Sequence, residues 1–200
     1  LIEDDIVILA DDWRLNKKYQ IDEKSFGSLM DWSHAGRVGN WLTMNGKKSP
    51  QYSIKANSLA RLRFINASNA RILKFGSSLK NNNIIAVDGV TVKPMLVKDF
   101  TLAPGQRIDL LINTVDLLKV DFFEISHTKQ LKAFTLNVTK ANNKTKDIAN
   151  INFNSNWILP KLDNAKTISI RMQGGAMGNL SKANLDGVEK DFRSLATEDK

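Results

Sequence analysis

Residues 61–71 read Arg-Leu-Arg-Phe-Ile-Asn-Ala-Ser-Asn-Ala-Arg. Polar and apolar side chains alternate over the first half of this stretch, and a period of two is typical of a β-strand with one solvent-facing side. Arg61 and Arg63 are therefore expected on the wet face, and Leu62 and Phe64 are expected in the core. The stretch predicts a strand that buries one face.

The second half of the same stretch predicts a corner of the chain. Small and amide side chains from Asn66 to Asn69 can cap free backbone groups where a strand ends. Arg71 is expected to make a fixed ion pair or a carbonyl contact beside that corner. We therefore assign this region a structural role.

Short strand-like segments recur on both sides of residues 61–71. They lie at residues 6–9, 42–44, 84–87, 108–112, 122–125 and 133–138. The turn pairs Asn45-Gly46 and Asp88-Gly89 tolerate positive φ, and Pro104-Gly105 suits a type II turn. Only residues 116–119 and the stretch after Ser181 look compatible with a helix. Many short strands separated by turns favour an all-β sandwich or barrel over a βαβ fold.

The composition changes after residue 139. Residues 140–156 are rich in asparagine and lysine, which is typical of a loop or linker. Residues 167–172 suit one more strand, and the rest of the tail is polar. We therefore expect one domain at residues 1–139, a linker at 140–160, and an incomplete or partly disordered unit at 161–200.

The chain has no cysteine and only two histidines. This composition excludes disulfides, thiol nucleophiles and cysteine-based zinc or iron–sulfur sites. His34 and His127 lie far apart in sequence, so this chain alone cannot build a copper or zinc centre with several imidazoles. Both are expected in exposed loops or turns, although His34 could line a substrate approach or bind a metal ion transiently. Met172 and Met177 carry thioethers that suit Cu(I), but packing is the expected role for two isolated methionines.

The formal net charge is +8. A positive surface can attract nucleic acid, anionic lipid or an acidic partner. However, the lysines are scattered, and few aromatic residues lie among them, unlike the pattern of single-strand binders. We therefore expect a solvated basic surface and no nucleic-acid partner. No apolar run is long enough for a membrane-spanning helix, and the acidic start after Leu1 suggests an excised or processed piece rather than a signal peptide.

Paired carboxylates occur at Asp4-Asp5 and Asp11-Asp12. Neighbouring residues of a strand point to opposite faces, so neither pair is placed to share a proton, and turn capping is the expected role. Arg107 and Asp109 lie two residues apart and share a face, where either can pair with a charge on a neighbouring strand. The sequence offers no nucleophile motif and no phosphate-binding loop, so it predicts no catalytic residues.

Four blocks of the sequence, in this order, resemble the second, cupredoxin-like domain of multicopper oxidases. They are residues 8–15, 43–50, 61–71 and 85–110. Any one of these blocks could reflect generic turn chemistry. All four blocks in the family's order argue against a chance resemblance. The resemblance implies a cupredoxin-like Greek-key β-sandwich or barrel. The residues that carry it are Asp12, Trp13, Asn45, Gly46, Arg61, Arg63, Asn66, Asn69, Arg71, Asp88, Gly89, Pro104, Gly105, Arg107 and Asp109.

Residues 170–178 look like the entry into the third domain of bacterial members, so residues 161–200 would begin the following cupredoxin domain. In the family, the third domain carries the mononuclear copper, and the first and third domains together hold the trinuclear cluster through His-x-His and His-Cys-His motifs. This sequence contains none of these motifs. The resemblance therefore implies a copper-free spacer domain within a copper enzyme, with flanking cupredoxin domains as partners and an exported, periplasmic location.

For the longer protein, the resemblance implies oxidation of phenols or metal ions coupled to reduction of O2 to water. This domain would then be a possible wall of the substrate approach. The alternative is a stand-alone basic β-sandwich that binds a carbohydrate, an anionic surface or a protein; a small copper carrier is disfavoured by the shortage of ligands. A stand-alone domain should bury its apolar surface, whereas a domain cut from its neighbours should expose an apolar patch. Trp13, Trp41 and Trp157 are the candidates for such a patch.

Overall fold

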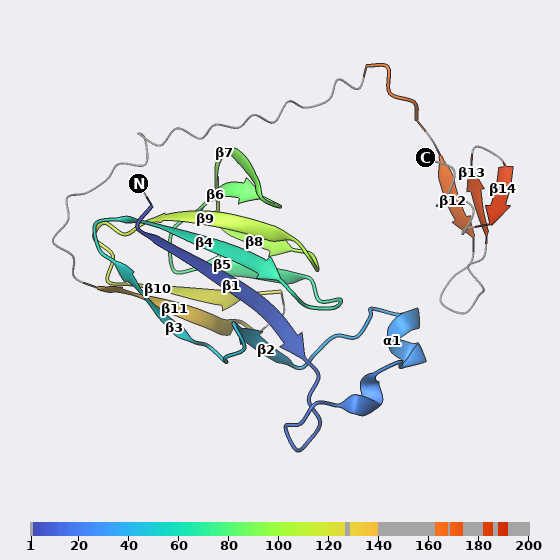
Figure 1. Cartoon of the computed structure of the whole chain (residues 1–200), viewed down its shortest axis with the longest axis horizontal. Coiled ribbons are helices and arrows are strands. Elements are labelled where there is room, and N and C mark those ends of the chain that lie inside the picture. Colours follow the sequence, from blue (N-terminus) through green and yellow to red (C-terminus); the bar gives the residue numbers. More distant parts are fainter. Residues whose placement is uncertain are drawn as a thin grey trace.

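The computed structural model describes residues 2–126, 129–139, 163–167, 169–173, 182–185 and 188–191. Most of them form two β-sheets that pack face to face (Figure 1). The predicted all-β sandwich is therefore confirmed. The predictions for residues 140–160, Trp157, His127 and Met177 fall outside the described residues.

The first sheet contains six strands and includes the stretch that decides the fold. These strands are β1 (Asp4–Trp13), β2 (Trp41–Met44), β4 (Leu59–Asn66), β6 (Asn82–Val87), β7 (Val90–Val97) and β9 (Arg107–Asn113). Their order is β2-β1-β4-β9-β6-β7. β4 runs parallel to β1 and antiparallel to β9, so the alternating stretch lies inside the sheet.

The second sheet contains five strands. They are β3 (Gln51–Lys55), β5 (Leu73–Ser77), β8 (Asp99–Leu102), β10 (Lys119–Glu124) and β11 (Leu131–Thr139). Their order is β3-β11-β10-β5-β8, with β3 and β11 parallel and the other pairs antiparallel. Because β4 and β5 belong to different sheets, the predicted corner after Asn66 carries the chain from one sheet to the other.

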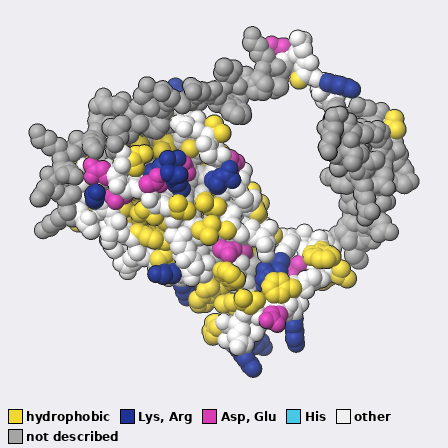
Figure 2. Space-filling model, viewed as in Figure 1, with side chains coloured by type: hydrophobic (Ala, Val, Ile, Leu, Met, Phe, Trp, Pro, Cys, Tyr) yellow, Lys and Arg dark blue, Asp and Glu magenta, His cyan; other side chains and the backbone are white. Residues whose placement is uncertain are grey.

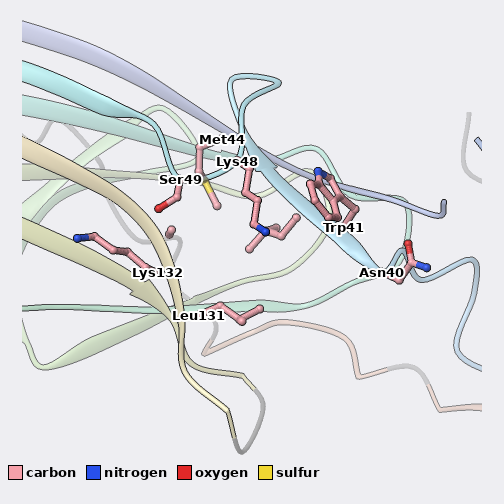
Figure 3. A pocket seen from close by; sticks show the side chains of 9 residues that line it. Asn40, Trp41, Met44, Lys48, Ser49, Leu131 and Lys132 are labelled. Atoms are coloured by element: carbon pink, nitrogen blue, oxygen red, sulfur yellow. The ribbon is translucent and has the colours of Figure 1, made fainter. Parts of the chain in front are cut away.

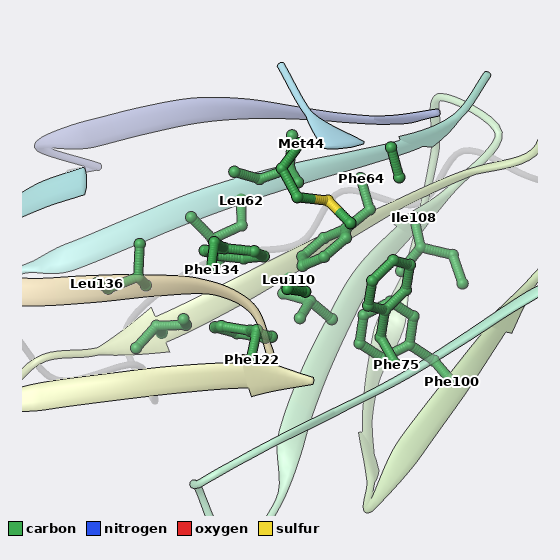
Figure 4. Close-up of a cluster of buried hydrophobic side chains, with 14 of the residues drawn as sticks. Met44, Leu62, Phe64, Phe75, Phe100, Ile108, Leu110, Phe122, Phe134 and Leu136 are labelled. Carbon is green, nitrogen blue, oxygen red and sulfur yellow. The ribbon is translucent and has the colours of Figure 1, made fainter. Parts of the chain in front are cut away.

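Phenylalanine side chains fill the space between the sheets (Figure 4). Phe64 and Leu62 on β4 are both fully buried, as the alternation predicts. The Phe64 ring lies 5.0 to 5.8 Å, between centroids, from the rings of four residues on the second sheet: Phe75, Phe100, Phe122 and Phe134. Each such aromatic pair adds about 0.5–1.5 kcal/mol beyond the burial of its area. Phe64, which belongs to the stretch 61–71, therefore lies at the centre of the interior.

Two short helical turns occur where the sequence predicts none. They are the 3-10 helix η1 (Glu23–Ser25) and the α-helix α1 (Leu29–Ser33). Ser28 caps α1, since its hydroxyl accepts a hydrogen bond from the backbone N–H of Asp31. A serine followed three residues later by an acidic residue is a known start signal, and it is the signal that marks this helix.

Neither segment predicted to be compatible with a helix is helical in the residues that the structure describes. Asp116 has a φ of +57°, which a right-handed helix excludes, and Lys119 already begins β10. Beyond Ser181 the chain forms β13 (Lys182–Leu185) and β14 (Val188–Asp191), which join β12 (Ile170–Gln173) in an antiparallel sheet of the order β12-β13-β14. The division of the chain at 139/140 and 160/161 stays a prediction.

Candidate functional site

Residues 14–40 form an excursion from the sandwich that carries η1 and α1 (Figure 1). The excursion leaves at the end of β1 and returns at the start of β2, where Trp13 pairs with Trp41. Its root is therefore narrow and adjoins an edge strand of the first sheet. These residues belong to neither sheet, so their side chains are candidates for a functional role.

A buried ion pair ties the root of the excursion to the corner after β4. Arg71 Nε donates to Asp12 Oδ2 over 2.8 Å, and the Gly39 backbone N–H donates to the same oxygen over 2.5 Å. Arg71 Nη2 in turn donates to the Gly39 carbonyl over 2.5 Å. The Asp12 side chain is only 1% exposed. Arg71 thus makes both contacts that the sequence leaves open, an ion pair and a carbonyl contact.

A second tether fixes α1 to the root. Arg14 donates to both carboxylate oxygens of Asp31, over 2.6 and 3.0 Å, and its Nε donates to the Val38 carbonyl over 2.9 Å. A two-point contact of this kind fixes direction as well as distance. The excursion is therefore held at three points of its length: Arg14, Asp31 and the segment that returns to β2.

A groove of about 430 Å³ lies beside Trp41 (Figure 3). Its walls come from β2 and from the start of β11, and the Nζ of Lys48 lies 4.5 Å above the Trp41 ring. A smaller hollow of about 220 Å³ shares Trp41, Leu42 and Leu131 with the groove and reaches Asp12. Within the described part of the chain, Asp12 Oδ1 is buried without a hydrogen-bond partner. That oxygen can accept a hydrogen bond from a water molecule or another donor.

Two arginine–carboxylate pairs lie on the outer face of the first sheet. Arg61 pairs with Asp109 across β4 and β9, and Arg63 pairs with Asp5 across β4 and β1. The hydrogen bond from Arg63 lowers the pKa of Asp5 below its ordinary value. Asp109 thus pairs with a neighbouring strand's charge. Asp4 caps the backbone N–H of Lys55, but turn capping is wrong for Asp5, because the residue lies within a strand opposite arginines.

Two asparagines of the family motif pin backbone segments together. Asn45 accepts from Leu9 N over 2.8 Å and donates to the Val7 carbonyl over 2.9 Å, which holds the Asn45-Gly46 turn against β1. Asn66 is buried at the corner, where its amide donates to the carbonyls of Arg71 and Leu102. Asn69 lies exposed in the same corner. These contacts are structural rather than chemical.

The remaining motif residues form turns. Asp88, Gly89 and Gly105 all have positive φ values, at +49°, +84° and +80°. Asp88 Oδ1 accepts from the backbone N–H of Arg107, and the Arg107 guanidinium donates to the Asp88 carbonyl. In the turn formed by Pro104 and Gly105, Gln106 N donates to the Ala103 carbonyl over 3.0 Å. This geometry is that of a type II turn with glycine at its third position.

The donor set of this chain does not fit a copper centre of the family. His34 ends α1 and is exposed, with Nδ1 2.9 Å from the Met30 carbonyl oxygen. Met172 lies in β12. Across the described ranges, no three side chains of His, Cys, Asp or Glu gather into a group able to hold a metal ion. Since oxidase copper needs clustered imidazole and thiolate donors, no catalytic step can be assigned to these residues.

Exposed apolar side chains gather on the excursion at positions that the sequence prediction missed. Phe26, Leu29, Met30 and Trp32 are 59%, 75%, 68% and 75% exposed. The available signal is the apolar pair Leu29-Met30 followed by Trp32 in a glycine-punctuated stretch. Of the predicted patch residues, Trp13 is 41% exposed, whereas Trp41 is half-buried beneath Tyr19 and Lys48.

Comparison with known proteins defines the class of protein. The sequence profile of the multicopper oxidases matches residues 4–146. The chain therefore belongs to the multicopper oxidase family, and its sandwich is the cupredoxin-like fold of that family. No helix in the described part of the chain is long and apolar enough to cross a membrane.

The curated relatives of this chain are cell division proteins. The cell division protein FtsP of Pectobacterium atrosepticum is 36% identical over 83 residues, which cover 40% of this chain and 17% of that protein. FtsP of Salmonella typhimurium is 32% identical over 112 residues, which cover 55% of this chain and 22% of that protein. The chain thus aligns with about a fifth of the length of these relatives.

Solved structures show the same fold. A multicopper oxidase from Pseudomonas Thermotolerans superposes with a TM-score of 0.73 at 20% identity, covering 86% of this chain and 41% of that one. The laccase-like multicopper oxidase CueO from Ochrobactrum sp., described as active towards lignin model compounds, gives a TM-score of 0.62 at 27% identity, covering 74% of this chain and 34% of that one. In both cases this chain matches less than half of the longer protein.

Proposed function

We propose that this chain is the copper-free second domain of a longer protein of the multicopper oxidase family, with the third domain beginning in residues 161–200. Its function is to hold the flanking cupredoxin domains at a fixed separation and orientation. One observation carries the proposal: 200 residues contain no cysteine and two histidines. A copper site needs several such donors at one point, so the metal chemistry belongs to the other domains.

The packing supports a rigid spacer. Four phenylalanines are fully buried between the sheets, and ion pairs cross from strand to strand on the outer face. Close-packed interiors transmit strain instead of absorbing it, so a domain of this kind can keep two neighbours in register. The exposed apolar side chains of the excursion favour a domain with neighbours over a stand-alone binding module.

The test uses the full-length protein that contains this chain. Copper per chain is measured by elemental mass spectrometry in the wild type and in a variant that combines His34→Ala and His127→Ala. We expect equal copper content and an equal oxidase rate, because the ligands lie outside these 200 residues. The proposal fails if the double variant loses a copper ion.

The chemistry of the longer protein is part of the same proposal. Four one-electron oxidations of a phenol or a metal ion such as Cu(I) would supply the electrons that, with four protons, reduce one O2 to two water molecules. This chain would take no electron itself and would form one wall of the substrate approach. An exported, periplasmic location belongs to the proposal as well.

A second candidate is a role in cell division without oxidase activity. It is favoured by the identity to FtsP, 36% over 83 residues, which exceeds the 20–27% identity to solved oxidases. The copper measurement separates the two candidates, since a purely structural division protein would bind no stoichiometric copper. Cells that lack such a protein would divide late and elongate, whatever metal is supplied.

A further inference from the structure

The groove beside Trp41 and the smaller hollow that reaches Asp12 adjoin each other. Four residues line both of them: Asn40, Trp41, Leu42 and Leu131. We infer that the two together, which we call the Trp41 site, bind a small ω-amino carboxylate. Its ammonium group lies in the hollow, its methylene chain follows the groove, and its carboxylate reaches Lys48. This inference goes beyond the proposed function, because the Trp41 site involves neither copper nor the spacing of domains.

Two buried carboxylates form the deep end of the Trp41 site. Asp12 is 5% exposed and Glu124 is 1% exposed, and both line the hollow. Asp12 Oδ2 accepts from Arg71 and Gly39, whereas Oδ1 has no hydrogen-bond partner in the described part of the chain. Glu124 Oε1 accepts from the backbone N–H and the hydroxyl of Ser126, and no described donor contacts Oε2. Each carboxylate therefore keeps one oxygen for a ligand donor.

The charges that line the hollow sum to one net negative charge. They are the carboxylates of Asp12 and Glu124 and the guanidinium of Arg71. Arg71 pairs with Asp12 over 2.8 Å, and no cation among the described residues pairs with Glu124. A buried carboxylate is costly when neither a counter-charge nor enough donors surround it. A bound ammonium group supplies one positive charge and three N–H donors.

A metal ion suits the hollow less well than an ammonium group. Ca²⁺ and Zn²⁺ take several carboxylate, carbonyl or imidazole ligands, and the described residues contain no group of three His, Cys, Asp or Glu side chains able to hold a metal ion. The guanidinium of Arg71 lies in the same wall, and it repels a divalent ion twice as strongly as a monovalent one at the same distance. The hollow therefore favours an organic cation.

The groove supplies an apolar middle to the Trp41 site. Met44 and Ala133 line it together with Leu131, which stands across from Trp41 (Figure 3). Its volume of about 430 Å³ is within the range of small-molecule sites. Methylene groups gain free energy when such walls remove them from water, so an aliphatic chain fits between the two ends of the site.

Lys48 supplies the positive charge at the mouth of the groove. Its Nζ lies 4.5 Å above the Trp41 ring, and no carboxylate among the described residues pairs with it. Lys132, the other lysine of the groove, lies 2.8 Å from a carboxylate oxygen of Asp121. A ligand carboxylate gains a charge-assisted hydrogen bond from a lysine that no carboxylate already holds. The two ends of the Trp41 site therefore carry opposite charges.

Calorimetric titration of the full-length protein with probes of one length tests the inference. They are 6-aminohexanoate, 1,6-diaminohexane and hexanoate. The diamine brings a like charge to Lys48, and hexanoate brings one to Glu124, so each probe satisfies only one end of the site. We expect 6-aminohexanoate to bind at least about tenfold more tightly than either of the others. Equal affinities, or no binding of 6-aminohexanoate, 4-aminobutanoate and 8-aminooctanoate, would overturn the inference and leave the hollow to water.

Hexanoate also measures general attraction of anions to the protein. The chain carries a net charge of +8, and basic side chains lie at several separate places on the face shown in Figure 2. Such a field acts on every carboxylate and weakens with added salt. The preference for 6-aminohexanoate over hexanoate must therefore persist at high salt, and a preference that salt removes would contradict a built site.

Three variants separate the two ends of the Trp41 site. Glu124→Gln keeps the size of the side chain and an acceptor for Ser126, and it should weaken 6-aminohexanoate about tenfold or more. Lys48→Met keeps an unbranched chain above Trp41 and should reduce 6-aminohexanoate to the affinity of hexylamine. Lys47→Met is the control, because this neighbouring exposed lysine lines neither the groove nor the hollow. If Glu124→Gln does not fold, the pair of lysine variants still decides, and equal losses in that pair would remove Lys48 from the site.

The same chemistry occurs in free ω-amino acids and in a lysine at the carboxyl end of a peptide. Nα-acetyl-lysine presents the peptide form, and its methylamide lacks the carboxylate. Tighter binding of Nα-acetyl-lysine than of 6-aminohexanoate would assign the Trp41 site to peptide ends, and the reverse order would assign it to free ω-amino acids. Equal binding of Nα-acetyl-lysine and its methylamide would contradict the role of Lys48. None of these results alters the copper measurement of the double histidine variant, so the two proposals can fail separately.

Discussion

The interior of the sandwich and the excursion between β1 and β2 use the same kinds of side chain in opposite ways. Phe64 is fully buried and touches four other phenylalanine rings, whereas Phe26 is 59% exposed and lies beneath one arginine. The interior closes itself, whereas the excursion is tethered through Arg14, Asp31 and the segment that returns to β2, and its apolar side chains remain exposed. The difference separates apolar residues that build the core from apolar residues that stay at the surface.

The largest difference between the two regions is expected when Phe64 and Phe26 are each replaced by alanine. Phe64→Ala should lower the free energy of unfolding by about 3–5 kcal/mol, through lost burial and a cavity. Phe26→Ala should cost about 0.5–1 kcal/mol, the scale of one cation–π contact with Arg37. Urea unfolding of the 200-residue chain measures both values. A Phe26→Ala variant as unstable as Phe64→Ala would show that the excursion is part of the core.

The next largest effect is expected at the root of the excursion. Asp12→Ala leaves Arg71 Nε and the Gly39 N–H without their shared acceptor in a buried place, and breaking a buried pair costs about 3 kcal/mol. The matched control is Asp5→Ala, which removes the acceptor of Arg63 on the exposed face and should cost less than about 1 kcal/mol. Thermal unfolding of the two variants provides the comparison. Equal shifts in Tm would mean that burial does not strengthen the tether.

A steric change at the same root should have an intermediate effect. A Cβ at Gly39 would meet backbone atoms of Asp12 and Trp13 at 2.7 Å, so Gly39→Ala should cost about 2 kcal/mol by forcing the backbone apart. Gly46→Ala is the control, because it has open space around it and a φ of +73°. It should cost about 1 kcal/mol, the penalty for a left-handed residue with a Cβ. Chemical denaturation measures the free energy of unfolding of both variants. A larger loss for Gly46→Ala than for Gly39→Ala would mean that backbone strain in the turn outweighs crowding at Gly39.

Much of the interior could be predicted from the sequence, because its signals are local. The alternation in residues 61–66 predicts which side chains of β4 are buried, and the turn pairs lie where hairpins reverse. The same reasoning predicts that Arg71 contacts a charge or a carbonyl. It could not identify Asp12 as the partner, since 59 residues separate the two and only the fold brings them together.

The excursion could not be predicted in the same way. A helix of five residues offers less than two turns of periodicity, so only the Ser28 cap marks it. The exposure of Leu29 and Trp32 is less predictable still, because apolar residues are normally assigned to a core when the sequence alone is considered.

The smallest effect concerns an ion cluster that belongs to neither region. On the second sheet, Asp121 lies 3.0 Å from Lys119 Nζ and 2.8 Å from Lys132 Nζ, and Thr135 donates to it over 2.6 Å. Desolvation alone would raise its pKa, but the hydrogen bonds from Lys132, Thr135 and Lys119 outweigh it and lower the pKa of Asp121 to about 2. The cluster therefore stabilises the fold above the ordinary aspartate pKa of 3.8. That contribution is lost as the pH falls towards about 2.

Solvent keeps this contribution small. Both lysines are about half exposed, so we expect about 1 kcal/mol rather than the value that the full shift would give. The gap in unfolding free energy between wild type and Asp121→Asn should be present at pH 6 and shrink steadily below about pH 4. A gap that stays constant down to pH 2.5 would mean that Asp121 contributes through packing rather than charge. In the tether, by contrast, the carboxylate of Asp12 is only 1% exposed, so we expect removal of that carboxylate to cost more than removal of the Asp121 charge.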